Sequence, residues 1–226
     1  IREVEKQNLT NYEIIDAIDG NKLNQNDLNI ATFKNKKNLN PWNNKMSPSQ
    51  IGCALSHIKV YQNFIKTEFE VALILEDDAI FLKDFDNNLK KLILKNFKFR
   101  KQIVLLSELK EFHGKALDSA DNYEIVNVSN AFFTHAYMIN REAARSIISF
   151  NYPVKTIADN FVFFKIYCNI KITGLNPFLL DQDKKSFKTT IESEETKKKV
   201  FLVRRTIYKI KNKVLKKIKT FKSHKS

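Results

Sequence analysis

The sequence predicts an α/β fold, a sandwich in which helices cover a mostly parallel central sheet, followed by a basic amphipathic helix at the C-terminal end. Short runs of branched apolar residues are typical of strands that are buried on both faces. Helical patterns separate these runs, as expected when crossover helices join parallel strands. With 226 residues and 43% hydrophobic content, the chain can build one sizeable core.

The N-terminal third is predicted to contain a strand, a long loop and a helix. Residues 12–20 read as a strand that an Asp-Gly turn ends, and residues 21–45 are a loop rich in Asn and Lys with one helical turn. A helix then begins with Ser47 as its N-cap, Pro48 at the first helical position and Gln50 completing a capping box.

Strands and helices alternate over the rest of the body, and Asn140 is the predicted N-cap of one of these helices. Strands are predicted over 70–76, 102–108, 123–129, 131–139 and 170–180, and helices over 84–97, 140–150 and 158–168.

Positive charge is concentrated at the C-terminal end. Of the formal net charge of +14, thirteen Lys or Arg residues lie in 197–226, which holds no Asp or Glu, so residues 1–196 are close to neutral. Apolar residues recur there at three- and four-residue steps, which predicts a basic amphipathic helix. Such a helix either packs on its own domain or lies in the plane of an anionic membrane. A nucleic-acid-binding protein would use the same tail, but the near-neutral body argues against that class.

Three adjacent carboxylates follow the predicted strand in LILEDDAIF. Glu76, Asp77 and Asp78 repel one another, and burying any of them unpaired is costly. Carboxylates at the carboxyl end of a strand are suited to Mg²⁺ or Mn²⁺, and a diphosphate would supply further oxygens. The four glycines form no phosphate-binding loop, so a metal-held diphosphate is the simple way to bind a nucleotide. The alternative is an acidic turn without a ligand.

Four segments, DAIDG, SQIGCALSHIKVYQNFI, LILEDDAIF and THAYMINREAARSII, resemble glycosyltransferase family 25 in order and spacing. The resemblance covers about residues 1–192 and implies a GT-A-like, Rossmann-type fold, a UDP-sugar donor (most often UDP-galactose) and Mn²⁺ or Mg²⁺ as cofactor. It also implies that Asp78 is the strongest metal ligand and that Glu76 faces the ribose or a second metal position. Family members usually begin with a further strand, so the first strand of the 1–196 domain is expected to be missing here.

The resemblance further implies a set of substrate-binding residues and one catalytic carboxylate. The substrate-binding set is Ser56, His57, Glu76, Asp77, Gln182 and Ser186. Asp159 would take the proton from the attacking hydroxyl, although as the N-cap of a helix it would need no further explanation. His57 is either a hydrogen-bonded core histidine or part of the active-site wall, and Cys53 is expected to be a small core residue.

These observations predict a cytoplasmic glycosyltransferase of lipooligosaccharide assembly, peripheral on the inner face of a bacterial membrane. Its partners would be a UDP-sugar, a lipid-linked oligosaccharide acceptor and an anionic membrane bound by 197–226. Two cysteines without a CxxC pair fit a reducing compartment. The alternative is an N-terminally incomplete, non-catalytic relative that binds a membrane or a partner.

Overall fold

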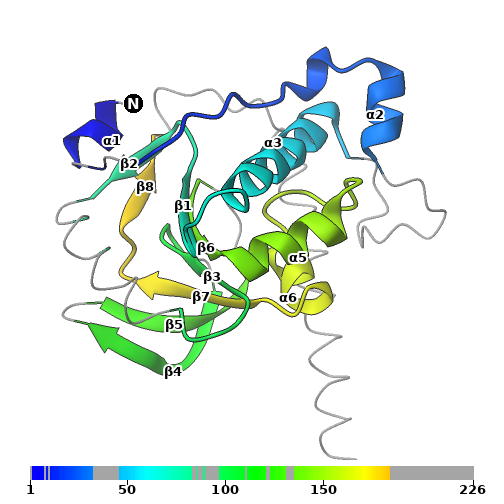
Figure 1. Ribbon diagram of the computed structural model, residues 1–226. Coiled ribbons are helices and arrows are strands. Elements are labelled where there is room, and N and C mark those ends of the chain that lie inside the picture. Colours follow the sequence, from blue (N-terminus) through cyan, green and yellow to red (C-terminus); the bar gives the residue numbers. More distant parts are fainter. Residues whose placement is uncertain are drawn as a thin grey trace, which may run out of the picture. The chain divides into compact units, whose positions relative to one another are not determined.

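A six-stranded sheet forms the centre of the fold, and its strands are mostly antiparallel (Figure 1). The computed structural model describes residues 2–7, 9, 11–32, 46–82, 85, 89, 97–109, 111–120, 123–130 and 135–183. The strand order is β1 (Val71–Leu75), β6 (Ala136–Asn140), β3 (Gln102–Leu105), β7 (Lys171–Asn176), β5 (Tyr123–Asn130) and β4 (Glu111–Ala120). Only the β3–β7 pair is parallel among these, so the predicted mostly parallel sheet is wrong.

The apolar runs were misleading about strand direction because this antiparallel sheet is covered on both faces. In β3, Ile103 belongs to one buried cluster and Val104 to the other. In β6, Tyr137 and Met138 divide between the clusters in the same way. Successive side chains of a strand point to opposite faces, so two covered faces require consecutive apolar residues whatever the direction of the neighbouring strand.

Helices cover one of these faces. Figure 1 shows α3 (Pro48–Phe64), α5 (Arg141–Asn151) and α6 (Phe161–Tyr167) on the same side of the sheet. The predicted caps are confirmed: Ser47 and Gln50 form the capping box of α3, and the Asn140 side chain accepts a hydrogen bond from Ala143 N at the start of α5. The local sequence therefore specifies where these helices begin.

The N-terminal segment differs from its prediction. Residues 12–19 are not paired as a strand; they run along α3, where Lys59 donates a hydrogen bond to Asp16 O and Asn63 to Glu13. Asp19 caps the short 3₁₀ helix η1 (Gly20–Lys22) instead of forming a strand-ending turn. The expected helical turn of the following loop is α2 (Gln25–Ala31), and a further short helix, α1 (Arg2–Lys6), precedes the segment.

Other predicted elements are confirmed in part. The strands predicted at 102–108 and 170–180 contain β3 and β7, and β5 extends one residue beyond the predicted 123–129, whereas β4 was not predicted. β1 contacts both buried clusters but is only half-buried, because it lies at the end of the strand order. Most of the predicted helix 84–97 and all of the tail 197–226 lie outside the described residues.

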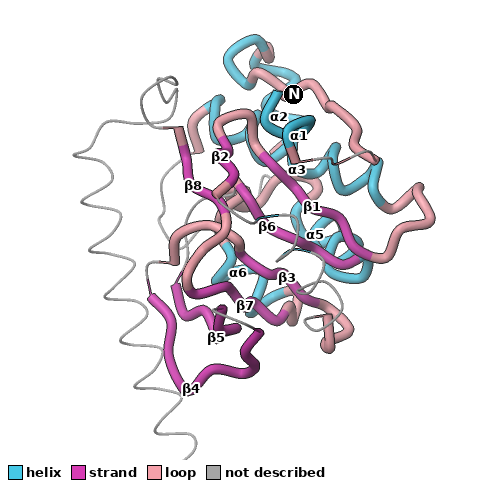
Figure 2. The backbone as a smooth tube through the Cα atoms, turned by 90° about the vertical axis from the view of Figure 1, so that its left-hand side faces the viewer, coloured by secondary structure: helices cyan, strands magenta, loops and turns pink. Residues whose placement is uncertain are grey.

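A second, two-stranded sheet lies beside the turn that follows β1. It pairs β2 (Ala79–Phe81) with β8 (Leu180–Gln182), and Figure 2 shows the two strands side by side. Within the described residues no helix is both long and apolar enough to cross a membrane.

Two glycines fix the N-terminal segment against α3. A Cβ atom on Gly52 would lie 2.4 Å from Gly20 N and 2.5 Å from Ile18 O, so only glycine fits this backbone contact. Ser56, one turn along the helix, accepts a hydrogen bond from Ile18 N at 2.8 Å and donates one to Gly52 O at 2.8 Å.

We predict that Gly52→Ala destabilises the protein although alanine is the better helix former. The gain in helix propensity is about 1 kcal/mol, whereas overpacking against backbone costs about 1–3 kcal/mol or more. Urea unfolding measures the difference. Gln62→Ala on the same helix is the control and should change the free energy of unfolding by less than about 0.5 kcal/mol. A stabilised Gly52→Ala variant would contradict the close contact.

Candidate functional site

The acidic turn between β1 and β2 divides its carboxylates between different parts of the fold. Glu76 Oε1 lies 3.1 Å from His57 Nε2 on α3. Asp78 Oδ2 accepts a hydrogen bond of 2.7 Å from Gln182 Nε2 on β8. Asp77 is exposed to solvent. Each of the two partly buried carboxylates thus has its own polar partner, which reduces the repulsion expected of the triplet.

Backbone hydrogen bonds set the position of this turn. Glu76 N donates to His135 O at 2.9 Å, which extends the pairing of β1 with β6, and Ala79 N donates to Glu76 O at 3.2 Å. Across the small sheet, Asp183 N donates to Asp78 O at 2.8 Å. At the other end of β1, Arg141 forms hydrogen bonds with the carbonyl oxygens of residues 65, 67 and 69. The site therefore lies on a strand that is held at both ends.

A buried chain of hydrogen bonds continues from Glu76 through His57 into the core. His57 Nδ1 lies 2.8 Å from the Tyr137 hydroxyl, which lies 2.5 Å from the Tyr61 hydroxyl. His57 is 7% exposed, Tyr61 2% and Tyr137 0%. Burial raises the pKa of Tyr61 and of Tyr137 above the ordinary tyrosine value, so both remain neutral hydroxyls.

This chain of hydrogen bonds is compatible with a proton on either ring nitrogen of His57. In neutral imidazole one nitrogen donates and the other accepts. If Nε2–H donates to Glu76, Nδ1 accepts from the Tyr137 hydroxyl, and Tyr137 in turn accepts from Tyr61. A hydroxyl can donate or accept, so the tyrosine pair can also reverse its direction and accept from Nδ1–H. The two tyrosines therefore support either tautomer of His57.

Cys53 lies next to the Glu76–His57 pair. Burial, followed by the charges of Glu76 and Asp159, raises the pKa of the Cys53 thiol to about 12. The sulfur, a His57 ring nitrogen and a Glu76 carboxylate oxygen all lie within 4.8 Å of one another. Cys53 was expected to be only a small core residue, and the structure instead places it at this polar cluster.

The two carboxylate oxygens of Asp78 differ in their surroundings. Its Oδ1 is buried and has no hydrogen-bond partner among the described residues, whereas Oδ2 is bound by Gln182. A buried carboxylate oxygen without a partner is costly, and a bound cation removes that cost. A lone oxygen donor of this kind fits a hard divalent cation such as Mg²⁺ or Mn²⁺.

The other residues predicted for the site are Asp159, Ser56 and Ser186, of which the structure describes the first two. Asp159 is half-buried and lies near Cys53, but it is not the N-cap of α6: Asn160 takes that place, accepting a hydrogen bond from Phe163 N. Ser56 links α3 to the N-terminal segment, as described above. Ser186 lies outside the described residues.

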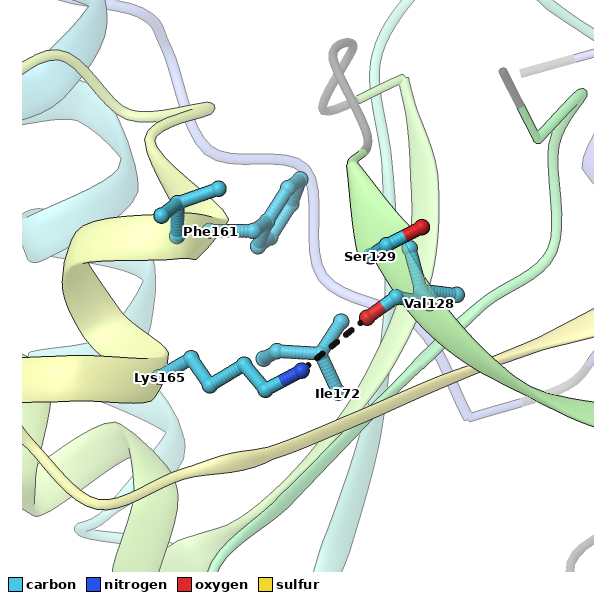
Figure 3. Close-up of a pocket in the computed structure, with 6 residues that line it drawn as sticks. Val128, Ser129, Phe161, Lys165 and Ile172 are labelled. Atoms are coloured by element: carbon cyan, nitrogen blue, oxygen red, sulfur yellow. Dashed lines mark hydrogen bonds between the residues drawn. The ribbon is translucent and has the colours of Figure 1, made fainter. Parts of the chain in front are cut away.

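A small pocket between α6, β5 and β7 is too small to be a nucleotide site. Figure 3 shows Phe161 and Lys165 of α6 facing Val128 and Ser129 of β5, with Lys165 donating a hydrogen bond to Val128 O at 3.2 Å. Ile172 lines it as well, and its volume is about 10 Å³, room for one water molecule. Ligand pockets have volumes of roughly 300–1,000 Å³.

Tyr61, Tyr137 and Cys53 were missed as site residues. Cys53, His57 and Tyr61 recur at four-residue steps, which places them on one face of α3, and this spacing is visible in the sequence. Tyr137 gave no such signal, because its contact with His57 joins residues that are 80 positions apart.

We predict that Tyr137→Phe destabilises the protein more than Tyr61→Phe. Tyr137 bridges two buried groups, and its loss leaves His57 Nδ1 unsatisfied, which costs about 1–3 kcal/mol. Loss of the Tyr61 hydroxyl leaves the His57 contact in place. Urea unfolding of both variants provides the comparison, and equal costs would show that the two hydroxyls do not act as a chain toward His57.

The family model and the similar proteins agree on one family. The family model described as "Glycosyltransferase family 25 (LPS biosynthesis protein)" matches residues 1–162. A human protein named procollagen galactosyltransferase 2 is 26% identical over 147 residues, which are 62% of this chain and 23% of the relative. A procollagen lysyl hydroxylase and glycosyltransferase of Acanthamoeba polyphaga mimivirus is 27% identical over 174 residues, 71% of this chain and 18% of the relative.

A Drosophila melanogaster glycosyltransferase 25 family member is 30% identical over 108 residues, 46% of this chain and 17% of the relative. The chain thus spans less than a quarter of the length of these relatives. The family match includes Cys53, His57, the acidic turn and Asp159, and it ends before Gln182. The chain belongs to glycosyltransferase family 25.

Proposed function

We propose that this glycosyltransferase moves a hexose, galactose first among candidates, from a UDP-sugar to a hydroxyl group of a sugar acceptor. The buried, unpartnered oxygen of Asp78 is the observation that supports this proposal most. It provides an oxygen ligand for Mn²⁺ or Mg²⁺ at the end of β1, beside an exposed Asp77. Galactose is favoured because the human relative is named a galactosyltransferase.

Each residue of the site has a role in this proposal. Asp78 binds the cation, and Gln182 holds the other oxygen of Asp78 so that the free one faces the ligand. When bound, the cation stabilises the charge that develops on the departing UDP. Glu76, oriented by His57, contacts the ribose or a second metal position, and Asp77 contacts the donor. The site would then correspond to the donor site of a GT-A-like fold.

Asp159 is proposed as the base that takes the proton from the attacking hydroxyl. A carboxylate serves this role when it lies within hydrogen-bond reach of that hydroxyl. The charge of Asp159 contributes to the raised pKa of the Cys53 thiol, and Cys53 in turn lies beside Glu76 and His57. Ser56 and Ser186 complete the proposed substrate-binding set, the first as a fixed part of α3.

For the acceptor we propose a lipid-linked oligosaccharide, presented at the inner face of a bacterial cytoplasmic membrane. The family description names LPS biosynthesis, and the basic residues of 197–226 suit an anionic surface. Binding in the plane of the membrane would bring enzyme and lipid-linked acceptor together on one surface.

We predict that Asp78→Asn abolishes metal-dependent transfer and leaves the fold intact. The variant loses one charge at the cation, which should cost several kcal/mol of transition-state stabilisation, a hundredfold or more in rate. UDP release from UDP-galactose, measured over a Mn²⁺ titration, reports the loss, and a melting curve without metal should match the parent's.

Asp27→Asn is the matched control, since it removes the same charge from the exposed surface of α2 and should keep full activity. Normal turnover of folded Asp78→Asn protein would contradict the metal site. Absence of UDP release from any UDP-sugar by the parent chain would favour the non-catalytic alternative.

We predict that deleting residues 197–226 abolishes binding to anionic membranes without lowering the melting temperature. Each Lys or Arg near such a surface contributes about 1 kcal/mol, and the tail holds thirteen of them. Co-sedimentation with phosphatidylglycerol vesicles measures binding, and neutral phosphatidylcholine vesicles are the control. A clear fall in melting temperature would instead indicate a tail that packs on its own domain.

A further inference from the structure

We propose that Cys53, His57 and Glu76 form a second metal site, one that takes a borderline divalent cation such as Zn²⁺. Their donor atoms are a sulfur, an imidazole nitrogen and a carboxylate oxygen, the set that Zn²⁺ prefers in proteins. Asp78 offers only oxygen, so the two sites differ in chemistry and select different ions.

The fold brings the three donors together from two elements. Cys53 and His57 lie four residues apart on α3, so their side chains share one face of the helix at adjacent turns. Glu76 follows the last residue of β1 and already contacts His57 at 3.1 Å. Two ligands therefore come from adjacent turns of one helix, and the third comes from the end of a strand.

The distances suit a tetrahedral ion after small side-chain movements. The three donor atoms lie within 4.8 Å of one another. With bonds of about 2.0–2.3 Å, a tetrahedral ion separates its ligand atoms by roughly 3.5 Å. Small rotations of the half-buried Cys53 and Glu76 side chains would bring the donors to this spacing, and with three protein ligands water would be the fourth.

The groups behind His57 support the nitrogen as a ligand. A metal-binding histidine usually donates its other N–H to a fixed partner, which sets the ring orientation and tautomer. Here His57 Nδ1 faces the Tyr137 hydroxyl at 2.8 Å, and Tyr137 is held by Tyr61. Because the tyrosine hydroxyls can reverse direction, His57 can give up its contact with Glu76 and direct a free Nε2 lone pair at the ion.

The local charge also favours a cation. Among the described residues, the charges of Glu76 and Asp159 act on the Cys53 thiol, so they would attract an ion bound at its sulfur. As the sulfur–metal bond forms, the thiol releases its proton to solvent. Because Glu76 and His57 also belong to the proposed donor site, an ion here would make transfer sensitive to Zn²⁺, a consequence that rests on the proposed function.

Binding of Co²⁺ tests the proposed metal site directly, without a measurement of transferase activity. We titrate the metal-free, reduced full-length chain with Co²⁺ and record the near-ultraviolet thiolate-to-cobalt charge-transfer band. The band should appear at one equivalent and disappear when Zn²⁺ is added, because Zn²⁺ binds such sites more tightly. Cys53→Ser should abolish it. Glu76→Gln and His57→Gln should each weaken Co²⁺ binding at least tenfold.

Two controls separate this site from other thiols and from the Asp78 site. Cys168→Ser should keep the band, because that buried thiol donates a hydrogen bond to Ser146 O and contacts the core. Asp78→Asn should keep it as well, although it stops Mn²⁺-dependent transfer. No band in the parent chain, or a band that persists in folded Cys53→Ser, would overturn the proposal, and neither result bears on the Asp78 site.

Discussion

The burial of β6 on both faces is the constraint on which the candidate site depends. Ala136 and Met138 point into one buried cluster, and Tyr137 and Ile139 point into the other, beneath the helices. Tyr137 is therefore fully buried, and its hydroxyl must find a partner inside the core. It finds His57 and Tyr61 on α3, so the packing that closes the core also fixes the histidine of the site.

The same arrangement explains how a chain can place three carboxylates in succession. Glu76 turns toward α3 and Asp78 toward β8, while Asp77 remains in solvent. Separate partners replace the mutual repulsion of a clustered triplet with local hydrogen bonds. One buried Asp78 oxygen nevertheless has no hydrogen-bond partner within the described part of the chain.

Local features of the fold were predictable from the sequence, and pairing over long distances was not. The caps at Ser47 and Asn140 depend on residues within three positions, and both were predicted correctly. Strand direction was predicted wrongly, because consecutive apolar residues report two covered faces and say nothing of how neighbouring strands run. β4 was missed because its sequence, EFHGKALDSA, has neither the alternation nor the branched residues of a typical strand.

The candidate site likewise combines local patterns that the sequence displays with long-range contacts that it does not. The Cys53–His57–Tyr61 spacing is a helical pattern that the sequence displays, and the acidic turn is visible as a motif. The contacts of Asp78 with Gln182 and of His57 with Tyr137 join residues 104 and 80 positions apart, so only the tertiary fold reveals them. The first contact occupies one oxygen of Asp78, and the other oxygen, which has no hydrogen-bond partner among the described residues, is the one proposed to bind a hard cation. The second contact supports either tautomer of His57, so that a histidine which holds Glu76 in the metal-free chain can also serve a softer ion beside Cys53.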